Sequence, residues 1–365
     1  MLIRSILASV AGAALLTPLA VFASSEAQLD MSSPAVQTAI AAQNSVTSNL
    51  MQNPNILGTA VGLNDDGTTN VRIFVDREAK NVVEIVDSLP RQIGVVKTQV
   101  EVIEKFRSAV GQAPIPDSVE GAPHTQKQTP PIQLGTSGGW TYDLANGFCC
   151  GGTSGALVSI GGVQHVLSNY HVYEADIVPG GNGRTAQTGD PIIQPGLIDV
   201  GCVASGAQSI ATLVKKSSLP GSNVDCAVAK VVTGMVDTQG RILEIGTVSK
   251  TTVAAALNQR VKKSGRSSGL TNSTVNGLNA TVTVTYENEC AGGTAFTKTF
   301  TGQILVSSPT NRPFIISGDS GSLMVENVRR NPHPVGLLYA SGTGIAVAQP
   351  INEVLTFLGA TMVGK

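Results

Sequence analysis

The sequence is poor in charged and aromatic residues. Only 13% of its 365 residues are charged, the formal net charge is −1, and aromatic residues make up 4%. Binding to nucleic acid or to an anionic membrane surface needs a concentrated basic face, so this composition argues against both partners. Glycine is plentiful, with 40 residues, and serine and threonine are frequent. This balance is typical of many short strands joined by tight turns rather than of a helical bundle.

Long apolar runs are also scarce, and the one that exists lies at the N-terminus. Residues 6–22 are largely apolar behind Arg4, and Val21-Phe22-Ala23 carries small residues at the two positions that a signal peptidase reads. We therefore predict a signal peptide over residues 1–23, a secreted or periplasmic location, and no membrane contact once the signal is removed. The alternative is a single membrane anchor, which Pro18 and the length and flanks of the stretch disfavour.

The cysteine spacing excludes the common zinc motifs. No pair has C-x-x-C spacing and no histidine lies near two cysteines, so we predict no metal site, and no other cofactor is implied. In an oxidising compartment the five cysteines allow two disulfides and one free thiol, and the sequence leaves the pairing open. They are Cys149, Cys150, Cys202, Cys226 and Cys290.

Residues 24–110 are predicted to form a small α+β domain. Helical periodicity and turn residues define its elements, and Asn64-Asp65-Asp66-Gly67 is a strong hairpin signal. In chain order the elements are a helix over 33–51, strands over 56–63 and 69–75, a helix over 78–88 and a strand over 95–103.

A change of composition marks residues 111–139 as a linker. Prolines at 114, 116, 123, 130 and 131 stand among Gln, Thr, Ser and Gly, and apolar residues are sparse. Such a segment has too little apolar surface to fold alone. We therefore predict an exposed Pro/Gly-rich linker, with His124 in solvent.

Residues 140–365 are predicted to be mainly β. Short apolar runs separated by glycine are typical of an all-β barrel or sandwich, and they occur at 156–158, 163–167, 226–232, 281–285 and 336–339. Near the end of the chain, apolar residues recur with the 3.6-residue period of a short amphipathic helix that lies on the core. These residues are Ile351, Val354, Leu355 and Leu358.

The segment Gly318-Asp319-Ser320-Gly321-Ser322 is the candidate nucleophile loop. Acyl transfer by serine needs a hydroxyl, a base that removes its proton, and donors that meet the oxyanion. Glycines near Ser320 allow a tight turn that aims the N–H groups of Gly318 and Ser320 at one point. The motif alone is also a fair turn sequence. Its place between the apolar segments 314–316 and 323–325 favours the catalytic interpretation.

The base must come from four histidines. His124 falls in the predicted linker, His333 lies between two prolines, and His165 lies in the middle of a strand. His171 follows that strand, where it gives way to a loop, and a strand end holds a side chain firmly at the rim of a barrel. We therefore predict His171 as the base.

An orienting carboxylate should be flanked by apolar residues, because burial strengthens its hydrogen bond to imidazole. Asp225 fits, since it opens the apolar run Cys226-Ala227-Val228-Ala229. Asp190 and Asp199 are competitors, but they lie in glycine-rich turn contexts where an aspartate commonly bonds its own backbone. Asp225 is therefore the predicted third member of the triad.

The order His171, Asp225, Ser320 resembles that of the chymotrypsin/trypsin family. Residues 167–172 are similar to its histidine motif, 224–227 to its aspartate motif and 318–321 to its serine motif. A bacterial-type branch with plant relatives is more similar still, through residues 189–196 and 263–271. The resemblance covers about residues 132–358. It implies two antiparallel six-stranded β-barrels of chymotrypsin type, with the site between them, besides the predicted C-terminal helix and the preceding small α+β domain.

The sequence also departs from the family pattern around the nucleophile. Ser322-Leu323 stands in place of the usual glycine and proline, and no cysteine lies two positions before Gly318. The resemblance therefore does not extend to activation by a freed N-terminus that inserts beside Asp319.

Resemblance further indicates the substrate-binding residues. Phe314 stands where relatives specific for Arg or Lys place an acid, and Leu338 stands where relatives that select glutamate tend to have histidine. An unpaired charge is costly to bury, so we predict a neutral or apolar residue before the scissile bond. The strand that pairs with the substrate backbone is predicted to include Tyr339, Ala340 and Ser341.

These features predict a secreted serine endopeptidase that cleaves protein or peptide substrates through an acyl-enzyme intermediate. The N-terminal domain would be a pro- or accessory domain, which makes the chain a zymogen. The main alternative is a non-catalytic binding module on the same scaffold, and retention of all three triad residue types argues against it. An esterase of another hydrolase fold would present the residues in the order Ser, Asp, His. The sequence leaves the oligomeric state open.

Overall fold

The computed structural model describes residues 27–108, 111–114, 123–145, 147–174, 184–286 and 295–365. The predicted signal peptide lies outside these residues. Among the residues described, no helix has the length and apolarity needed to cross a membrane. Most of the regular structure is β, arranged in two large and mainly antiparallel sheets of ten and eleven strands.

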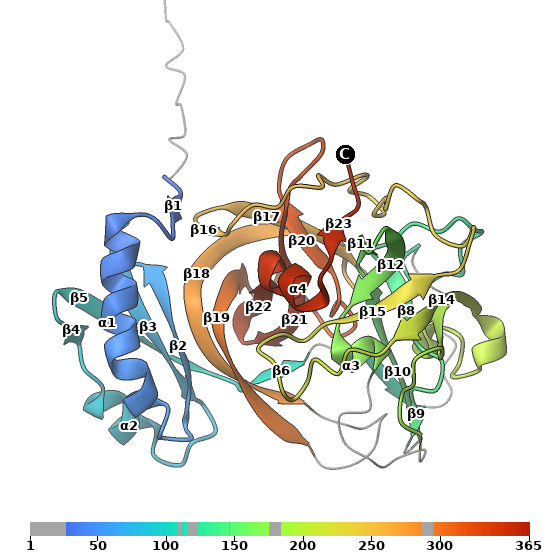
Figure 1. Ribbon diagram of the computed structural model, residues 1–365. Helices are drawn as coiled ribbons and strands as arrows, with labels where there is room; N and C mark the ends of the chain where they lie inside the picture. The colour runs from blue at the N-terminus through green and yellow to red at the C-terminus, as the bar shows by residue number, and fades with distance from the viewer. Residues whose placement is uncertain (1–26, 109–110, 115–122, 146, 175–183, 287–294) are drawn as a thin grey trace, which may run out of the picture.

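The N-terminal α+β unit extends the larger of these sheets (Figure 1). Helix α1 packs the buried side chains of Val36 and Ala39 against strands β2 and β3, and β2 pairs antiparallel with β18 of the second sheet. Both helices and the three longer strands predicted here are confirmed, although α2 begins four residues later than expected. The elements are β1 (Leu29–Asp30), α1 (Pro34–Leu50), β2 (Ile56–Leu63), β3 (Thr69–Asp76), α2 (Val82–Ser88), β4 (Gln92–Ile93), β5 (Val96–Ile103), β6 (Phe106–Ser108) and β7 (Gly111–Pro114).

The first sheet wraps around an apolar core that includes Trp140, Leu157, Val166 and Val228. Its strand order is β23-β11-β12-β15-β14-β13-β8-β10-β7. Strand β7 therefore adds a segment from before the barrel to the outer edge of β10. The elements are β8 (Thr136–Trp140), β9 (Leu144–Ala145), β10 (Phe148–Ser154), β11 (Ala156–Ile160), β12 (Val163–Ser168), α3 (Tyr170–Tyr173), β13 (Pro191–Gln194), η1 (Leu197–Asp199), η2 (Ala204–Gly206), β14 (Gln208–Val214) and β15 (Ala227–Val231).

The second sheet joins the C-terminal barrel to the N-terminal unit. Its order is β17-β20-β21-β22-β19-β18-β2-β3-β5-β4, and β17 also pairs with β18 so that the barrel strands close on themselves. The long strands β18 and β19 curve between the two units (Figure 1). The elements are β16 (Ala256–Leu257), β17 (Arg260–Gly265), β18 (Gly269–Tyr286), β19 (Phe296–Ser308), β20 (Leu323–Glu326), β21 (Pro334–Gly342), β22 (Gly344–Pro350), α4 (Ile351–Leu358) and β23 (Thr361–Met362).

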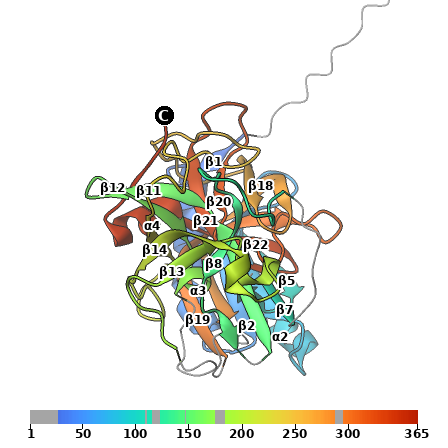
Figure 2. The same ribbon diagram turned by 90° about the vertical axis from the view of Figure 1, so that its right-hand side faces the viewer.

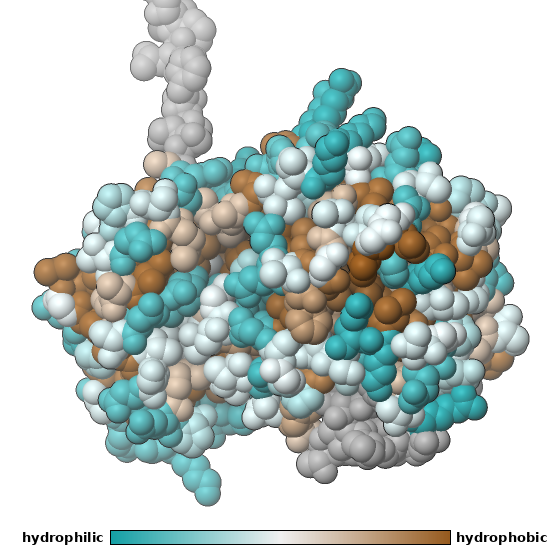
Figure 3. All heavy atoms as spheres, viewed as in Figure 1, coloured by the Kyte–Doolittle hydropathy of each residue, from teal (hydrophilic) through white to brown (hydrophobic). Residues whose placement is uncertain are grey.

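The predicted fold class is confirmed. The chain is mainly β, with two sheets that curve into barrels and a C-terminal helix, as in the chymotrypsin type. The barrels lie side by side in Figure 1, and in Figure 2 the first overlaps the second. Helix α4 buries the four apolar residues that carry its period, and Gly359 ends it in the left-handed conformation at φ 63°. On the face seen in Figure 3, hydrophilic and hydrophobic residues intermingle.

The segment predicted as an exposed linker is packed over part of its length. His124 is 5% exposed; its Nδ1 lies 2.9 Å from the carbonyl oxygen of Gly135 and its Nε2 lies 2.8 Å from Glu244. Ile132 and Leu134 are fully buried in the first core. The prediction of a solvated His124 is therefore wrong, because its partners come from residues distant in sequence that composition does not reveal. Residues 115–122 of the predicted linker lie outside the described residues.

The cysteines agree with the allowed set of two disulfides and one thiol. Cys149 bonds Cys202, with 5.6 Å between their Cα atoms, and Cys150 is also disulfide-bonded. Cys226 is a free, buried thiol. Disulfides agree with the predicted oxidising compartment.

Candidate active site

His171 lies on a single helical turn that follows strand β12. The strand ends at Ser168, Asn169 is extended, and α3 begins at Tyr170. The side-chain amide of Asn169 donates to the carbonyl of Asp225 at 2.7 Å, which fixes the turn to the start of β15. His171 is 6% exposed, so its ring is held between packed elements rather than on a free loop.

Asp225 and His171 form a buried hydrogen-bonded pair. Nδ1 of His171 lies 2.6 Å from Oδ2 of Asp225, and the Asp225 side chain is fully buried. The backbone N–H of Tyr170 donates to Oδ1 at 2.7 Å. A carboxylate in this position accepts the Nδ1 proton, which leaves Nε2 as the basic nitrogen.

The competing acids and histidines have other partners. Asp190 accepts from the Trp140 indole at 2.9 Å, and Asp199 pairs with Arg266 at 2.5 Å. His165 lies 2.8 Å from the carbonyl of Val163, and burial lowers its pKa. His333 lies 2.6 Å from Glu326. Among the described residues, these side chains bond away from the His171–Asp225 pair.

Ser320 lies in a buried turn whose backbone conformation requires glycine at two neighbouring positions. Gly318 and Gly321 have φ angles of 96° and 92°, in the left-handed region. A Cβ atom on Gly321 would lie 2.3 Å from both Oγ of Ser168 and the carbonyl oxygen of Thr153, so any larger residue would push the loop off the first barrel. The glycines thus seat the loop against the end of β12.

The Ser320 loop and the helical turn that carries His171 both pack against strand β10. A Cβ atom on Gly152 would touch Val172, the residue after His171, at 2.6 Å and the carbonyl oxygen of Ser320 at 3.0 Å. The hydroxyl of Ser320 donates to the carbonyl of Tyr339 at 3.1 Å. Nε2 of His171 is buried and has no hydrogen-bond partner within the described part of the chain. The residue after His171 and the carbonyl of Ser320 thus both lie against Gly152, while the side chains of Ser320 and His171 are not hydrogen-bonded to each other here.

The two backbone N–H groups predicted as oxyanion donors differ from the other N–H groups of their loop in their hydrogen bonding. The N–H groups of Asp319, Gly321 and Ser322 donate to the carbonyls of Ile316, Leu338 and Asp319. Among the residues that the structure describes, no acceptor is recorded for the N–H groups of Gly318 and Ser320. Free N–H groups at these two positions are what an oxyanion site requires.

Asp319 is paired with a cation from within the barrel. Nζ of Lys263 on β17 lies 3.2 Å from Oδ2 of Asp319, and both side chains are fully buried. The backbone N–H groups of Ser267 and Ser268 donate to Oδ1, at 2.9 and 3.1 Å. Burial lowers the pKa of Lys263, and the Asp319 carboxylate opposes that shift. The aspartate beside the nucleophile candidate therefore has its counterion before any new N-terminus is made.

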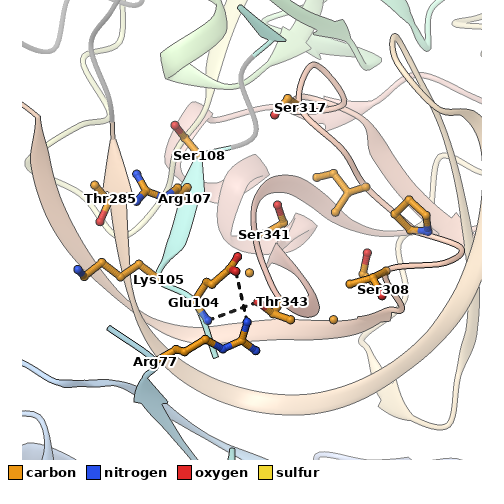
Figure 4. Close-up of a pocket in the computed structure, with 15 residues that line it drawn as sticks. Arg77, Glu104, Lys105, Arg107, Ser108, Thr285, Ser308, Ser317, Ser341 and Thr343 are labelled. Atoms are coloured by element: carbon orange, nitrogen blue, oxygen red, sulfur yellow. Dashed lines mark hydrogen bonds and ion pairs between the residues drawn. The ribbon is translucent and has the colours of Figure 1, made fainter. Parts of the chain in front are cut away.

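Strand β6 lies along the strand that was predicted to bind substrate. Ser108 pairs with Ala340 and Arg107 pairs with Ser341, antiparallel, on β21. A cavity of about 490 Å³ opens beside this ladder, lined by Arg107, Ser108 and Ser341, among others (Figure 4). Ala340 and Ser341 are thus placed where a backbone strand binds, and that strand belongs to the N-terminal part of the same chain.

Phe314 and Leu338 lie outside this cavity. Both are buried in the core of the second sheet, and neither lines the cavity. Both were predicted to bind substrate, and in this structure their side chains face the packed interior. Tyr339 is also fully buried, and its carbonyl rather than its ring reaches Ser320.

Strand β7 flanks Ser320 on the other side. Its Gly111 pairs with Gly151 of β10, and two residues further along β10 the N–H of Thr153 donates to the carbonyl of Ser320 at 2.8 Å. Strands β6 and β7 are consecutive in the chain. The polypeptide therefore approaches the Ser320 loop along β21 and leaves it along β10.

Two residues of the site were missed by sequence reasoning. Lys263 opens the segment 263–271 that resembles the bacterial-type branch, but it was not predicted as a partner of Asp319. Tyr286 donates its hydroxyl to Oδ2 of Asp225 at 2.8 Å from 61 residues away. The strand pattern around Lys263 gives only a weak indication that its side chain is buried. Nothing near Tyr286 in the sequence indicates its partner.

Asp143, outside this cluster, is buried without a partner. It is 1% exposed, neither carboxylate oxygen has a hydrogen-bond partner among the described residues, and burial raises its pKa from the ordinary 3.8 to about 8. A raised pKa means that the folded state holds the proton more tightly than the unfolded state. The contribution of Asp143 to stability is therefore most favourable below about pH 4 and is lost as the pH rises towards 8.

Replacing Asp143 by asparagine should remove this pH dependence. A shift of this size corresponds to a loss on the order of 5 kcal/mol above pH 8 in the wild type, and the neutral amide does not ionise. We expect the free energy of unfolding of Asp143→Asn, measured in urea at pH 5 and pH 8.5, to change far less than that of the wild type. If the free energy of unfolding changes equally between pH 5 and pH 8.5 in the two proteins, Asp143 is solvated.

Comparison with known proteins gives partial matches. A family model for the Nal1 C-terminal domain matches residues 221–348. No curated protein matches the chain. Among solved structures, the chain is similar to a glutamic acid-specific serine protease (TM-score 0.41, 17% identity, 63% of this chain and 100% of that chain). It is also similar to Thermobifida fusca Protease A (0.38, 21%, 59% and 92%) and to Cellulomonas bogoriensis chymotrypsin (0.35, 22%, 58% and 91%). The roles of individual residues rest on this chain's own contacts.

Proposed function

We propose that the protein is a secreted serine endopeptidase with Ser320 as nucleophile, His171 as base and Asp225 as the carboxylate that orients it. The observation that carries the proposal is the buried 2.6 Å bond from Nδ1 of His171 to Asp225, with Nε2 buried and left without a hydrogen-bond partner among the described residues. A histidine in this arrangement has one nitrogen fixed and the other available for proton transfer.

The mechanism follows from these positions. Nε2 of His171 takes the proton of Ser320 as Oγ attacks the peptide carbonyl, and Asp225 stabilises the imidazolium. The N–H groups of Gly318 and Ser320 bind the oxyanion. His171 then gives its proton to the leaving amine, and a water molecule hydrolyses the acyl-enzyme by the same route. Oγ must first turn from the carbonyl of Tyr339 towards Nε2, since it donates to that carbonyl here.

The N-terminal unit is proposed to keep this site closed as a propeptide. Strand β6 occupies Ala340 and Ser341, and β7 occupies the opposite side of the Ser320 loop. A substrate strand that needed the same backbone groups of β21 would have to displace β6. Cleavage of the chain between Ser108 and Gly111 would free both ends. The two residues between them in the sequence, Ala109 and Val110, are uncharged, in line with the expected neutral preference.

Processing of the chain provides the test. Wild-type protein and the Ser320→Ala variant are secreted side by side, and their intact masses are measured. We expect the wild type to yield a fragment that begins after Ser108 and before Gln112, and the variant to remain uncut there. Identical cleavage in both proteins would assign the cut to another protease, and an uncut wild type would contradict the propeptide role.

The alternative of a non-catalytic binding module has one observation in its favour. In this structure Ser320 donates to Tyr339 rather than to His171. A module of this kind would never cut itself and would never react with a serine-directed reagent, even after the N-terminal unit has been removed.

A further inference from the structure

The carboxylate of Asp225 has a second side-chain donor on the oxygen that holds His171. The hydroxyl of Tyr286 donates to Oδ2 at 2.8 Å, and Nδ1 of His171 lies 2.6 Å from the same atom. We propose that Tyr286 is a positioning residue of the site: its phenol fixes Oδ2 of Asp225 and, through it, the imidazole of His171. This inference rests on the proposed serine endopeptidase function.

Packing holds the ring of Tyr286 in one orientation, with its hydroxyl directed at Asp225. Tyr286 is 1% exposed and is the last paired residue of β18, opposite Phe296 on β19. The two rings stack with centroids 4.9 Å apart. The edge of the pair meets His171, whose ring centroid lies 5.7 Å from that of Tyr286 at an interplanar angle of 62°. A β-ladder and an aromatic stack, rather than a mobile loop, aim this donor.

Asp225 needs such a donor because water does not reach it. Its side chain is fully buried, and Oδ1 already accepts the N–H of Tyr170 at 2.7 Å. Without Tyr286, Oδ2 would keep only His171 among the described residues, and the carboxylate could rotate. Two consequences follow. The imidazole is held less firmly for proton transfer, and the unshared negative charge stabilises the protonated imidazole more strongly.

Other titratable groups around the pair do not obscure this effect. Burial raises the pKa of Tyr286 and of Tyr339 on β21 well above the ordinary value, so both phenols stay protonated at neutral pH. Burial likewise raises the pKa of the Cys226 thiol. Glu174, at the end of α3, accepts the backbone N–H groups of Lys216 and Ser217. The pH–rate profile of Tyr286→Phe is therefore compared with that of the wild type, in which all these groups are the same.

The substitution Tyr286→Phe tests the inference. It removes the hydroxyl and keeps the aromatic stack. We expect kcat/KM for a peptide to fall about tenfold, through kcat rather than KM, because a hydrogen bond to a charged group contributes roughly that factor. We also expect the acid limb of the pH profile to move to higher pH, and the low-field proton resonance of the Nδ1–H group to shift.

Tyr173→Phe is the matched control. Tyr173 is an equally buried tyrosine, whose hydroxyl bonds Oγ of Ser154 at 2.7 Å, away from Asp225. Removal of the Tyr173 hydroxyl should lower the free energy of unfolding. It should leave the acid limb of the pH–rate profile and the Nδ1–H resonance of His171 unchanged.

The outcomes separate the two proposals. If Tyr286→Phe keeps the wild-type rate, acid limb and resonance, or changes only as Tyr173→Phe does, the positioning role is wrong and the endopeptidase stands. If the wild type itself shows no hydrolysis that depends on Ser320, both proposals are overturned.

Discussion

Replacing Lys263 by methionine is expected to lower the free energy of unfolding by about 3–5 kcal/mol, because it leaves a buried carboxylate without its cation. Asp319 would keep the N–H groups of Ser267, Ser268 and Ile316, and these amides carry only partial charge. The measurement is urea unfolding at neutral pH. Asp319 adjoins Ser320, so the same variant should also hydrolyse peptides more slowly than the wild type.

The neighbouring Lys262 supplies the control. Its ammonium reaches the carbonyl of Val328 at 2.8 Å on an exposed face, while Lys263 is fully buried beside Asp319. Lys262→Met should therefore cost under about 1 kcal/mol, as expected of exposed polar contacts. If the two variants lose the same stability, the Lys263–Asp319 pair is not the counterion pair described above. Adding Asp319→Asn to Lys263→Met should restore part of the loss, because no unpaired charge then remains buried.

Local signals in the sequence were enough for most of the fold. The periodicity of residues 34–50 and 351–358 and the turn at 64–67 specify their elements with little help from distant residues, and the structure has helices or a hairpin at each. The gathering of His171, Asp225 and the Ser320 loop was also expected, from motif order and from the strand contexts of the residues. Whether they act as a triad remains a prediction.

What the sequence could not give depends on long-range packing. His124 is buried because Glu244, 120 residues away, meets its ring. Phe314 and Leu338 were predicted to bind substrate from their positions relative to motifs, but both side chains pack into the second core. For Leu338 on β21, strand register decides the face on which the side chain emerges. The pairing of β6 with β21 joins a segment before the barrels to a strand near the end of the chain. The composition of these segments does not predict this pairing.

The largest effect on activity is expected at Ser320. Ser320→Ala removes the attacking oxygen, and loss of a triad nucleophile lowers kcat by about 10⁶-fold in enzymes of this chemistry. Ser322, two residues further on, donates its hydroxyl to the carbonyl of Asp319, so it offers no substitute.

Covalent labelling by a fluorophosphonate, mapped by tandem mass spectrometry, therefore tests the central claim most directly. Wild-type protein whose N-terminal unit has been cleaved away should carry one label on Ser320, and Ser320→Ala should carry none. A wild-type protein that never reacts after cleavage, or a label that persists in Ser320→Ala, would contradict the assignment of Ser320 as nucleophile.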